Sequence, residues 1–464
     1  MIIETNQAKY EIIRELGIIV NSEIKKEVEY LIPARKSDDV IKKQLRKKID
    51  DREITAQLSS VLAIALGITE FCPYRCSYCI YSGDYKDERT HSSARMDKNT
   101  ALDTVDFFLK LIIHSHSNRK NYFDIGFYGG EPLTAFDLIK ETIEYSEQKI
   151  SAGNLFPRFD IGFRLTTNGY LLNDDNMDFL QARNVKVDIS IDGPREEHDK
   201  FRLLADGRPT WETVIANIKK IKEKYPIYFR DHVKFLCTLH PLHNLDNVDN
   251  FFKENSDLFN NNKIHFSNVV LDHLVPHKKD TLLNILRSKK KDNTPNSLLF
   301  LQRVRSLIEG KIYLNNVYDQ EAFTGVCFPG GEKVYIDSKG RFHICEKMNP
   351  NFSIGDIDKG FDYEKIKALR YAYIEEVIRQ RCWECNFWFM CNMCYAYTTA
   401  NKEIKIECDS AKKSYKNLIR DYLTKLEKDY EQNLMHSNDH PVDLIGQLQT
   451  EGYQRSNKTR DRNP

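Results

Sequence analysis

Between residues 62 and 275, short apolar runs alternate with longer stretches in which apolar residues recur at helical spacing. The short runs predict strands and the longer stretches predict helices. The predicted strands are residues 62–68, 123–128, 161–166, 185–191 and 232–239. The predicted helices are residues 100–115, 138–148 and 211–222. Repeated strand–helix units predict a parallel sheet with right-handed crossovers, so residues 61–275 are predicted to have an α/β fold.

A small module precedes this segment. Residues 1–60 are rich in Lys, Glu and Ile, and Gly17 is their only glycine. They predict a short strand pair near residues 10–20 and a charged helix over residues 38–60. Their pattern alone does not assign them a role.

Three segments follow the predicted α/β fold. Residues 276–320 are polar and then helical, and they are predicted to form a linker. Residues 321–410 are rich in cysteine, with short strands predicted at 333–337 and 341–345. Residues 411–464 are predicted to form a charged helix followed by a polar, disordered tail.

Three cysteines, Cys72, Cys76 and Cys79, follow the first predicted strand at the spacing C-x3-C-x2-C. A helical stretch is predicted to follow this cysteine loop. They supply three thiolates and no fourth, whereas a structural zinc site takes four ligands. A 4Fe–4S cluster takes one cysteine at each iron, so three cysteines leave one iron open to bind a small molecule. The spacing therefore favours a catalytic iron–sulfur cluster over a zinc site.

Polar motifs stand at the ends of the next three predicted strands. They are Gly129-Gly130-Glu131-Pro132, then Thr167-Asn168-Gly169, and then Ser190-Ile191-Asp192-Gly193-Pro194. In α/β folds, ligands bind at the C-terminal ends of the strands. We therefore expect these motifs to share one site with the cysteine loop.

Most of the remaining cysteines gather near the C-terminus. Seven of the 11 cysteines lie between positions 327 and 408, and they are Cys327, Cys345, Cys382, Cys385, Cys391, Cys394 and Cys408. Taken alone, the two C-x2-C pairs within residues 382–394 would favour a zinc ribbon. The odd total favours metal or redox use over a disulfide framework. Cys237 stands apart in an apolar run and is expected to be an inert, buried core residue.

Composition and charge exclude several classes of protein. The net charge is +1, with 41% hydrophobic and 30% charged residues, which is ordinary for a globular protein and offers no basic surface for nucleic acid. No apolar run approaches the ~20 residues that a membrane span needs. The N-terminal residues lack the basic and apolar regions of a signal peptide. We therefore expect a cytoplasmic protein that binds neither nucleic acid nor a membrane.

The cysteine loop, the glycine-rich motif at 129–132 and the S-x-D-G-P…H-D-x-x-R run at 190–202 together resemble the radical S-adenosylmethionine (SAM) enzymes. The resemblance implies a partial (β/α)6 barrel and a 4Fe–4S cluster held by Cys72, Cys76 and Cys79. It further implies that SAM contacts Tyr81, Gly129, Gly130, Glu131, Pro132, Asn168, Ser190, Asp192 and Arg202. Without the family, the same residues would be turn glycines and a surface arginine.

The C-terminal cysteines resemble a SPASM domain, an auxiliary-cluster module of radical SAM enzymes that modify peptides and proteins. The resemblance implies two auxiliary 4Fe–4S clusters, one held by Cys382, Cys385, Cys391 and Cys408 and an inner one held by Cys327, Cys345 and Cys394. Two departures stand out: the spacing before Cys394 is one residue short, and Glu321 occupies the place of a further cysteine. The inner cluster is thus expected to have either an open iron, which could capture a substrate thiolate, or a non-cysteine ligand.

Two further features accompany these cysteines. Glu346 follows Cys345 directly, near the place where sulfatase-maturing relatives have an aspartate proposed as the base. It is a candidate catalytic base, and the alternative is a solvated surface glutamate. The aromatic residues between the cysteines are expected to form a dry shell around the clusters rather than a peptide-binding face. They are Trp383, Phe387, Trp388, Phe389, Tyr395 and Tyr397.

The resemblance implies reductive cleavage of SAM to methionine and a 5′-deoxyadenosyl radical, which takes a hydrogen atom from the substrate. Residues 79–92 resemble maturases that form cysteine thioethers, so the expected substrate is a ribosomally made, Cys-containing precursor peptide. Sulfatase maturation of Cys or Ser to formylglycine, peptide C–C crosslinking and epimerisation are the alternatives. A non-catalytic zinc or electron-transfer protein is disfavoured because it has no need of the glycine-rich motif.

The implied cofactors are SAM and three 4Fe–4S clusters. The implied partners are the precursor peptide and an electron donor such as ferredoxin or flavodoxin. Residues 1–60 are a candidate for a reduced leader-peptide-binding domain.

Overall fold

The structure is a computed structural model of the chain. It describes residues 2–4, 8–13, 18–21, 50–59, 61–85, 89–113, 122–152, 160–259, 264–269, 329–331 and 333–373, with Cys385, Cys408 and seven positions between 412 and 424. Among the helices in these segments, none combines the length and the apolar character that a membrane crossing requires.

Six parallel strands form the centre of the fold and pair in the order of the chain. They are β4 Ala63–Thr69, β5 Tyr122–Gly129, β6 Asp160–Thr167, β7 Lys186–Ser190, β8 Val233–Leu239 and β9 Ile264–Asn268. In the part of the chain that the structure describes, β9 pairs with β8 and not with β4, so the barrel is not closed. This arrangement confirms the predicted parallel α/β architecture.

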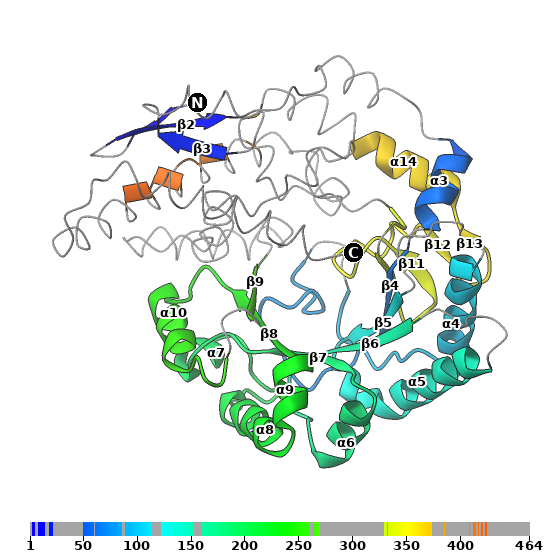
Figure 1. Ribbon diagram of the computed structural model, residues 1–464, viewed down its shortest axis with the longest axis horizontal. Coiled ribbons are helices and arrows are strands. Elements are labelled where there is room, and N and C mark those ends of the chain that lie inside the picture. Colours follow the sequence, from blue (N-terminus) through cyan, green and yellow to red (C-terminus); the bar gives the residue numbers. More distant parts are fainter. Residues whose placement is uncertain are drawn as a thin grey trace, which may run out of the picture.

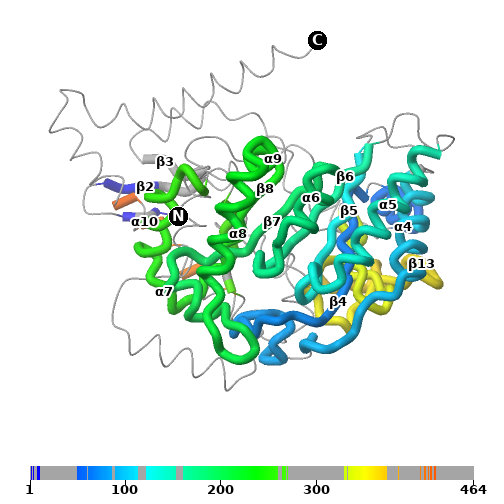
Figure 2. The backbone as a smooth tube through the Cα atoms, turned by 90° about the horizontal axis from the view of Figure 1, so that it is seen from below, coloured from blue at the N-terminus to red at the C-terminus, as the bar shows by residue number. Residues whose placement is uncertain are grey.

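Helices cover the outer face of the curved sheet (Figure 1). They are α4 Lys98–Ile113, α5 Phe136–Ser151, α6 Asp174–Ala182, α7 Arg195–His198, α8 Trp211–Lys224, α9 Pro226–His232 and α10 Leu245–Glu254, with a 3-10 turn η1 at Pro132–Ala135. Their apolar faces meet the outward residues of the strands in one core, to which β5 contributes Phe123, Ile125 and Phe127. Seen from below, α8, α6, α5 and α4 follow one another along the sheet (Figure 2).

The inward face of the strands carries charge instead. Arg164 on β6 lies 2.9 Å from Asp188 on β7 and 4.0 Å from Asp124 on β5. Lys186 on β7 also approaches Asp124, at 3.4 Å. Alternation along a strand sends successive side chains to opposite faces, which explains how charged residues interrupt otherwise apolar strands. The predictions did not identify this ion-pair network.

A C-terminal extension continues the same sheet beyond β4. Strand β10 Lys333–Ile336 pairs with β4 in parallel, and β11 Arg341–His343, β12 Gly355–Asp356 and β13 Gly360–Phe361 follow in antiparallel pairings. The extension lies beside α4 and β4 in both views (Figures 1 and 2). Two helices, α3 Asp51–Leu58 and α14 Tyr363–Tyr373, pack at this edge and are joined by an ion pair between Asp51 and Lys367 at 2.6 Å. The strands predicted within a separate cysteine-rich segment thus extend the sheet of the barrel.

Several local predictions differ from the structure. Strand β9 and helices α6, α9 and α10 were not predicted, because each of these stretches is short. The cysteine loop was expected to open into a helix, but residues 80–85 form turns and α4 begins only at Lys98. The strand pair near residues 10–20 is confirmed by β2 Lys9–Ile13 and β3 Ile18–Asn21, which join β1 Ile2–Glu4 in an antiparallel sheet. The helix predicted at 296–310 lies outside the described residues.

Candidate functional site

The cysteine loop leaves the C-terminal end of β4, where a parallel α/β sheet binds its ligands. Cys72 is 7% exposed and Cys76 is 9% exposed, while Cys79 is half-buried. Within the described residues, no group of three or more His, Cys, Asp or Glu side chains is arranged to hold a metal ion. A 4Fe–4S cluster binds each thiolate at a different iron, so its three ligands need not converge on one point.

A second segment, residues 201–205, holds the cysteine loop in place. Tyr74 and Leu204 form an antiparallel bridge between them. Backbone N–H groups of Arg75, Ser77 and Ala205 donate to the carbonyls of Leu203 at 2.8 Å, Phe201 at 3.1 Å and Pro73 at 2.9 Å. The end of the H-D-x-x-R run and the three residues after it thus support the loop through their backbone.

The sulfurs of Cys72 and Cys79 accept N–H donors, and Cys72 and Cys76 are buried. The N–H groups of Tyr74 and Tyr81 donate to the sulfurs of Cys72 and Cys79, each at 3.4 Å, and Asn168 Nδ2 lies 3.7 Å from Cys72 Sγ. Burial, and after it the Glu131 carboxylate, raise the pKa of Cys72 to about 12. Buried thiols with a raised pKa lose their protons when a metal cation binds them. These cysteines could therefore bind the iron ions of a cluster as thiolates.

The glycines of the 129–132 motif allow the turn after β5 to press against the entry to the cysteine loop. Gly129 has φ +136°, and a Cβ placed there would lie 2.2 Å from the carbonyl oxygen of Thr69. A Cβ on Gly130 would lie 2.2 Å from the carbonyl oxygen of Phe71. Two backbone hydrogen bonds stabilise this contact: the Gly130 N–H donates to the Thr69 carbonyl at 2.7 Å, and the Glu131 N–H donates to the Phe71 carbonyl at 2.8 Å. Only glycine permits this approach of backbone to backbone.

Glu131 is fully buried and links the ends of β5 and β6. Its carboxylate accepts hydrogen bonds from Thr167 Oγ1 at 2.7 Å, the Asn168 N–H at 2.8 Å and the Leu133 N–H at 3.1 Å. Burial raises the pKa of Glu131 to about 7 in spite of these three donors. A carboxylate has about four acceptor positions, so at most one is left for a ligand such as the SAM amino group.

Asp192 and Arg202 form a buried ion pair beneath the cysteine loop. Arg202 Nε lies 2.8 Å from Asp192 Oδ2, and their side chains are 9% and 0% exposed. Asp192 also accepts hydrogen bonds from the hydroxyl of Tyr78 and from the N–H of Thr238. Burial favours the neutral acid, but the guanidinium prevails and holds the pKa of Asp192 below its usual value. The structure therefore shows Arg202 bound to Asp192, whereas the resemblance implied a contact with SAM.

The other residues of these motifs lie at the same end of the barrel. Asn168 and Pro132 are buried at the ends of β6 and β5. Ser190 is the last residue of β7 and is half-buried. The Tyr81 hydroxyl lies 3.0 Å from that of Tyr335 on β10, so the C-terminal extension meets the cysteine loop directly.

Glu346 lies near this contact but is tied to a lysine. Its Oε2 is 3.1 Å from Lys333 Nζ, and its side chain is only 18% exposed, so it is not the solvated surface residue considered above. Burial alone would raise the pKa of Glu346, but Lys333 and Lys347 lower it overall. A carboxylate held in its ionised form by lysines is a weaker base, which lessens the case for a catalytic role.

The auxiliary-cluster cysteines are described in part. Cys345, Cys385 and Cys408 are half-buried and pack against the main core. Cys327, Cys382, Cys391 and Cys394 lie outside the described residues, as do Glu321 and the aromatic residues between 383 and 397. The isolated Cys237 is 0% exposed, which confirms its predicted place in the core.

Two histidines that sequence reasoning missed follow the end of β8. The His240 ring centroid lies 3.9 Å from that of Phe201 and 6.2 Å from that of Tyr78. The His240 N–H donates to His243 Nδ1 at 3.1 Å. Burial lowers the pKa of His240 to about 3, so the ring is neutral. Their position directly after a predicted strand, like that of the other motifs, was the signal that could have found them.

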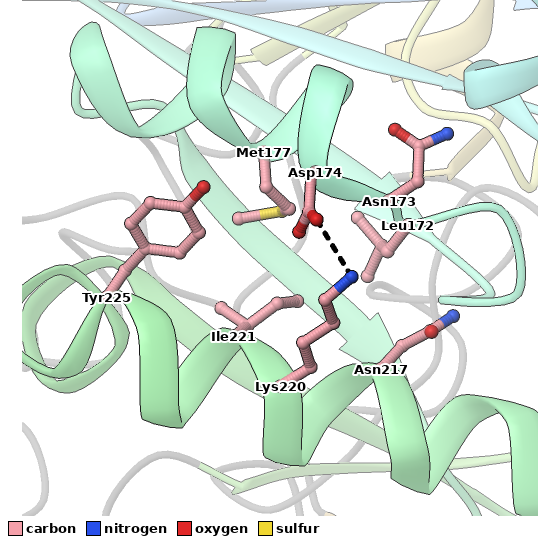
Figure 3. A pocket seen from close by; sticks show the side chains of 8 residues that line it. All are labelled: Leu172, Asn173, Asp174, Met177, Asn217, Lys220, Ile221 and Tyr225. Atoms are coloured by element: carbon pink, nitrogen blue, oxygen red, sulfur yellow. Dashed lines mark hydrogen bonds and ion pairs between the residues drawn. The ribbon is translucent and has the colours of Figure 1, made fainter.

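A small cavity lies elsewhere, between α6 and α8 on the helical layer (Figure 3). It measures about 10 Å³, which is barely one water molecule. Figure 3 shows Lys220 spanning it to reach Asp174, with 2.9 Å between the charged atoms. None of the site residues predicted from the sequence lines it, so it is not part of the candidate site.

Comparisons with known proteins match this description. Residues 66–254 match the model of the radical SAM superfamily. The chain is 28% identical over 184 residues to the cysteine-type anaerobic sulfatase-maturating enzyme of Clostridium novyi, covering 39% of this chain and 45% of that enzyme. It is 23% identical over 332 residues to the radical SAM cyclopropyl synthase TigE of Paramaledivibacter caminithermalis, covering 70% of this chain and 66% of that enzyme. The chain thus spans less than two thirds of the length of either relative.

Solved structures agree on the fold. The structure of native anSMEcpe with bound AdoMet superimposes with a TM-score of 0.53 at 17% identity, covering 78% of this chain and 99% of that one. Native anSMEcpe with bound AdoMet and Cp18Cys peptide gives a TM-score of 0.51 at 17% identity, covering 78% and 98%. Residues 66–254 therefore form a radical SAM domain, the domain of an enzyme superfamily. Such a domain implies SAM and a 4Fe–4S cluster as cofactors.

Proposed function

We propose that this enzyme cleaves SAM at a 4Fe–4S cluster held by Cys72, Cys76 and Cys79. The observation that carries the proposal is the cysteine loop at the C-terminal end of β4, where Cys72 and Cys76 are buried and the sulfurs of Cys72 and Cys79 accept backbone N–H donors. When bound, the cluster and SAM supply an electron and a carbon radical that can take a hydrogen atom from an unactivated C–H bond. The surrounding residues bind and orient the cofactors and the substrate.

These residues position the cofactors and keep water out. Gly129 and Gly130 set the entry of the cysteine loop, and Asn168 orients the sulfur of Cys72. The Asp192–Arg202 pair holds the cysteine loop in place, because Asp192 also accepts a hydrogen bond from the hydroxyl of Tyr78 in that loop. For SAM we propose contacts with Tyr81, the 129–132 backbone, the remaining acceptor position of Glu131, and Ser190. Arg202 would reach SAM only with those of its N–H groups that Asp192 leaves free, because a guanidinium has five donors.

We propose that the substrate is a peptide and that the product is a cysteine thioether. The support is the resemblance of residues 79–92 to thioether-forming maturases and the peptide present in one anSMEcpe structure. A thioether removes one hydrogen from sulfur and one from carbon, so two electrons leave the peptide. One leaves with the hydrogen atom taken by the radical, and the other needs an acceptor, which suits an auxiliary cluster near Cys345.

Two other products are also supported. The sulfatase-maturating relatives favour oxidation of Cys or Ser to formylglycine. The similarity to TigE favours carbon–carbon bond formation in a peptide. Mass spectrometry of the product of a Cys-containing peptide separates these outcomes, because only thioether formation consumes a thiol while leaving the sulfur in the product.

The auxiliary cysteines, the electron donor and the N-terminal module complete the proposal. Cys382, Cys385, Cys391 and Cys408 are proposed to hold one auxiliary cluster, and Cys327, Cys345 and Cys394 the inner one. Ferredoxin or flavodoxin is the proposed reductant. The antiparallel sheet β1–β3 is proposed to bind a leader peptide, because an edge strand of a sheet can pair with an added strand.

One anaerobic preparation tests the central proposal. The full chain should carry iron, about twelve atoms for three clusters, and release 5′-deoxyadenosine from SAM after reduction. Cys76→Ala should abolish the release, whereas the buried Cys237→Ala, which removes a cysteine outside the loop, should retain it. Zinc in place of iron, or SAM cleavage by Cys76→Ala, would show that the assignment is wrong.

A further inference from the structure

His343 on β11 is completely buried and only one of its ring nitrogens has a partner. The Nε2 atom lies 3.1 Å from Asp337 Oδ2, and the ring is 0% exposed. Its Nδ1 atom has no hydrogen-bond partner in the part of the chain that the structure describes. A buried polar atom without a partner is costly, and it calls for an explanation such as an unseen ion.

The hydrogen bond to Asp337 fixes what the free nitrogen can do. A carboxylate accepts, so Nε2 carries the proton and Nδ1 carries a lone pair. A histidine that donates one N–H to a carboxylate and presents the other nitrogen as a lone pair has the arrangement of a metal ligand. The carboxylate sets the orientation of the ring and makes the other nitrogen more basic.

The hairpin places this nitrogen beside the candidate site. His343 is paired across the hairpin with Tyr335, so both side chains lie on one face, while Phe342 points to the opposite face and the core. The Tyr335 hydroxyl meets Tyr81 of the cysteine loop at 3.0 Å. Cys345 is two residues beyond His343, which limits the distance between their Cα atoms to about 7 Å.

A buried positive charge next to this face has no ion-pair partner among the described residues. Arg89 is 7% exposed, and its guanidinium lies 5.0 Å from the Tyr335 ring. One terminal nitrogen donates to the carbonyls of Glu346 at 2.7 Å and Met348 at 3.0 Å, and the other has no partner among the described residues. A buried guanidinium without a carboxylate is unfavourable unless another negative group is close. An iron–sulfur cluster bound by thiolates is such a group.

We propose that His343 Nδ1 is a ligand of the auxiliary iron–sulfur cluster at Cys345, for which the sequence offers one cysteine too few. This inference rests on the proposed function, because it assumes that the cluster is present. It decides between the two outcomes left open by the sequence: the inner cluster has a non-cysteine ligand rather than an open iron. Imidazole in place of thiolate raises a cluster's reduction potential, which suits an acceptor of the second electron from the substrate.

Pulsed electron paramagnetic resonance of the reduced, SAM-free full chain tests the ligand directly. Enzyme from cells fed 14N- or 15N-histidine should show a nitrogen coupling that changes with the isotope. His343→Cys should lose the coupling and keep its iron, because the new thiolate replaces the imidazole. His265→Ala, which removes an exposed histidine from β9, should keep the coupling. The proposal is overturned if the wild type binds its full iron without a nitrogen coupling, or if His343→Cys keeps one.

A second variant covers the case in which His343→Cys does not fold. Asp337→Asn keeps the size of the side chain but weakens its hold on the ring, and loss of such a partner costs about 10- to 100-fold in metal affinity. Iron retained under a chelator should fall accordingly in Asp337→Asn and not in Asp358→Asn, whose side chain is exposed. Equal retention in the two variants would contradict the role of His343.

These results separate the ligand from the function. If the wild type cleaves SAM and modifies a peptide but shows no histidine coupling, the inference about His343 fails and the proposed function stands. If the wild type binds no iron or does not cleave SAM, the proposed function itself fails.

Discussion

Replacing Gly130 by alanine should damage SAM cleavage far more than it damages folding. The new Cβ would lie 2.2 Å from the Phe71 carbonyl oxygen, 2.6 Å from its carbon and 2.9 Å from the Glu70 carbon, all of them backbone atoms. Contacts under 3.0 Å do not persist, so the backbone must move by at least the 0.8 Å between 2.2 and 3.0 Å. Phe71 directly precedes Cys72, and the displacement therefore passes to the cysteine loop.

The size of the effect follows from this displacement. A misplacement of about 1 Å in a reacting group costs roughly 100-fold in rate, which corresponds to about 2.7 kcal/mol in the activation barrier. Overpacking of this kind costs about 1–3 kcal/mol in the free energy of unfolding, which a domain of this size should survive. Gly130→Ala should therefore fold, and its rate of 5′-deoxyadenosine release should fall by about two orders of magnitude.

The assay is anaerobic SAM cleavage per iron bound, with urea unfolding measured on the same preparation. The matched control is Gly360→Ala on β13, where φ is +77° and the nearest atom to a new Cβ is 3.5 Å away on Phe107. That substitution strains the backbone by about 1–2 kcal/mol but lies outside the turn that packs on the cysteine loop. The reasoning is refuted if Gly130→Ala cleaves SAM within a few-fold of the wild type, or if Gly360→Ala loses cleavage equally.

Three further substitutions give distinct outcomes. Asp192→Asn leaves Arg202 buried without its anion and should lower the free energy of unfolding by about 3–5 kcal/mol. The control Asp206→Asn, at an exposed position, should change the urea midpoint little. Equal midpoints in the two variants would contradict a stabilising role of the buried ion pair. Burial lowers the pKa of His198 to about 3, so below pH ~6.5 the unfolded chain binds a proton that the folded chain does not. The free energy of unfolding should therefore fall from pH 7.5 to pH 5, and it should fall less steeply in His198→Asn. Parallel pH profiles of the urea midpoint in the two proteins would contradict this. Glu346→Gln should leave SAM cleavage and product yield within a few-fold in a mass-spectrometric assay, and loss of product with cleavage intact would restore Glu346 as the base.

The predictions from sequence were most successful where the signal was local. The alternation of apolar residues identified five of the six parallel strands, and the motifs at their ends lie at one end of the barrel as expected. Strand β9 was not predicted because Ile264–Asn268 is only five residues long and contains only two apolar residues. Helix α6 has few apolar positions, and its capping box at Asn173 and Asn176 is a signal that was available but not used.

The roles of single residues were less predictable. Arg202 was assigned to SAM because of its place in a motif, yet the buried carboxylate that binds it stands ten residues earlier in the chain. The carboxylate of Glu131 is shared among donors on three segments, which no local pattern reveals. His343 drew no attention in the sequence, because its signal is an unpaired nitrogen that exists only once the hairpin has formed.

The order of residues in the sequence was enough to indicate a radical SAM domain and its candidate motifs. Covalent spacing decides which residues can share one loop, so the three cysteines and the glycine-rich turn could be recognised from their order alone. The tertiary structure decided which polar groups meet, because hydrogen bonds and ion pairs depend on burial and on distances between segments far apart in the chain. The support of the cysteine loop by residues 201–205, the Asp192–Arg202 pair and the meeting of Tyr81 with Tyr335 all belong to this second kind.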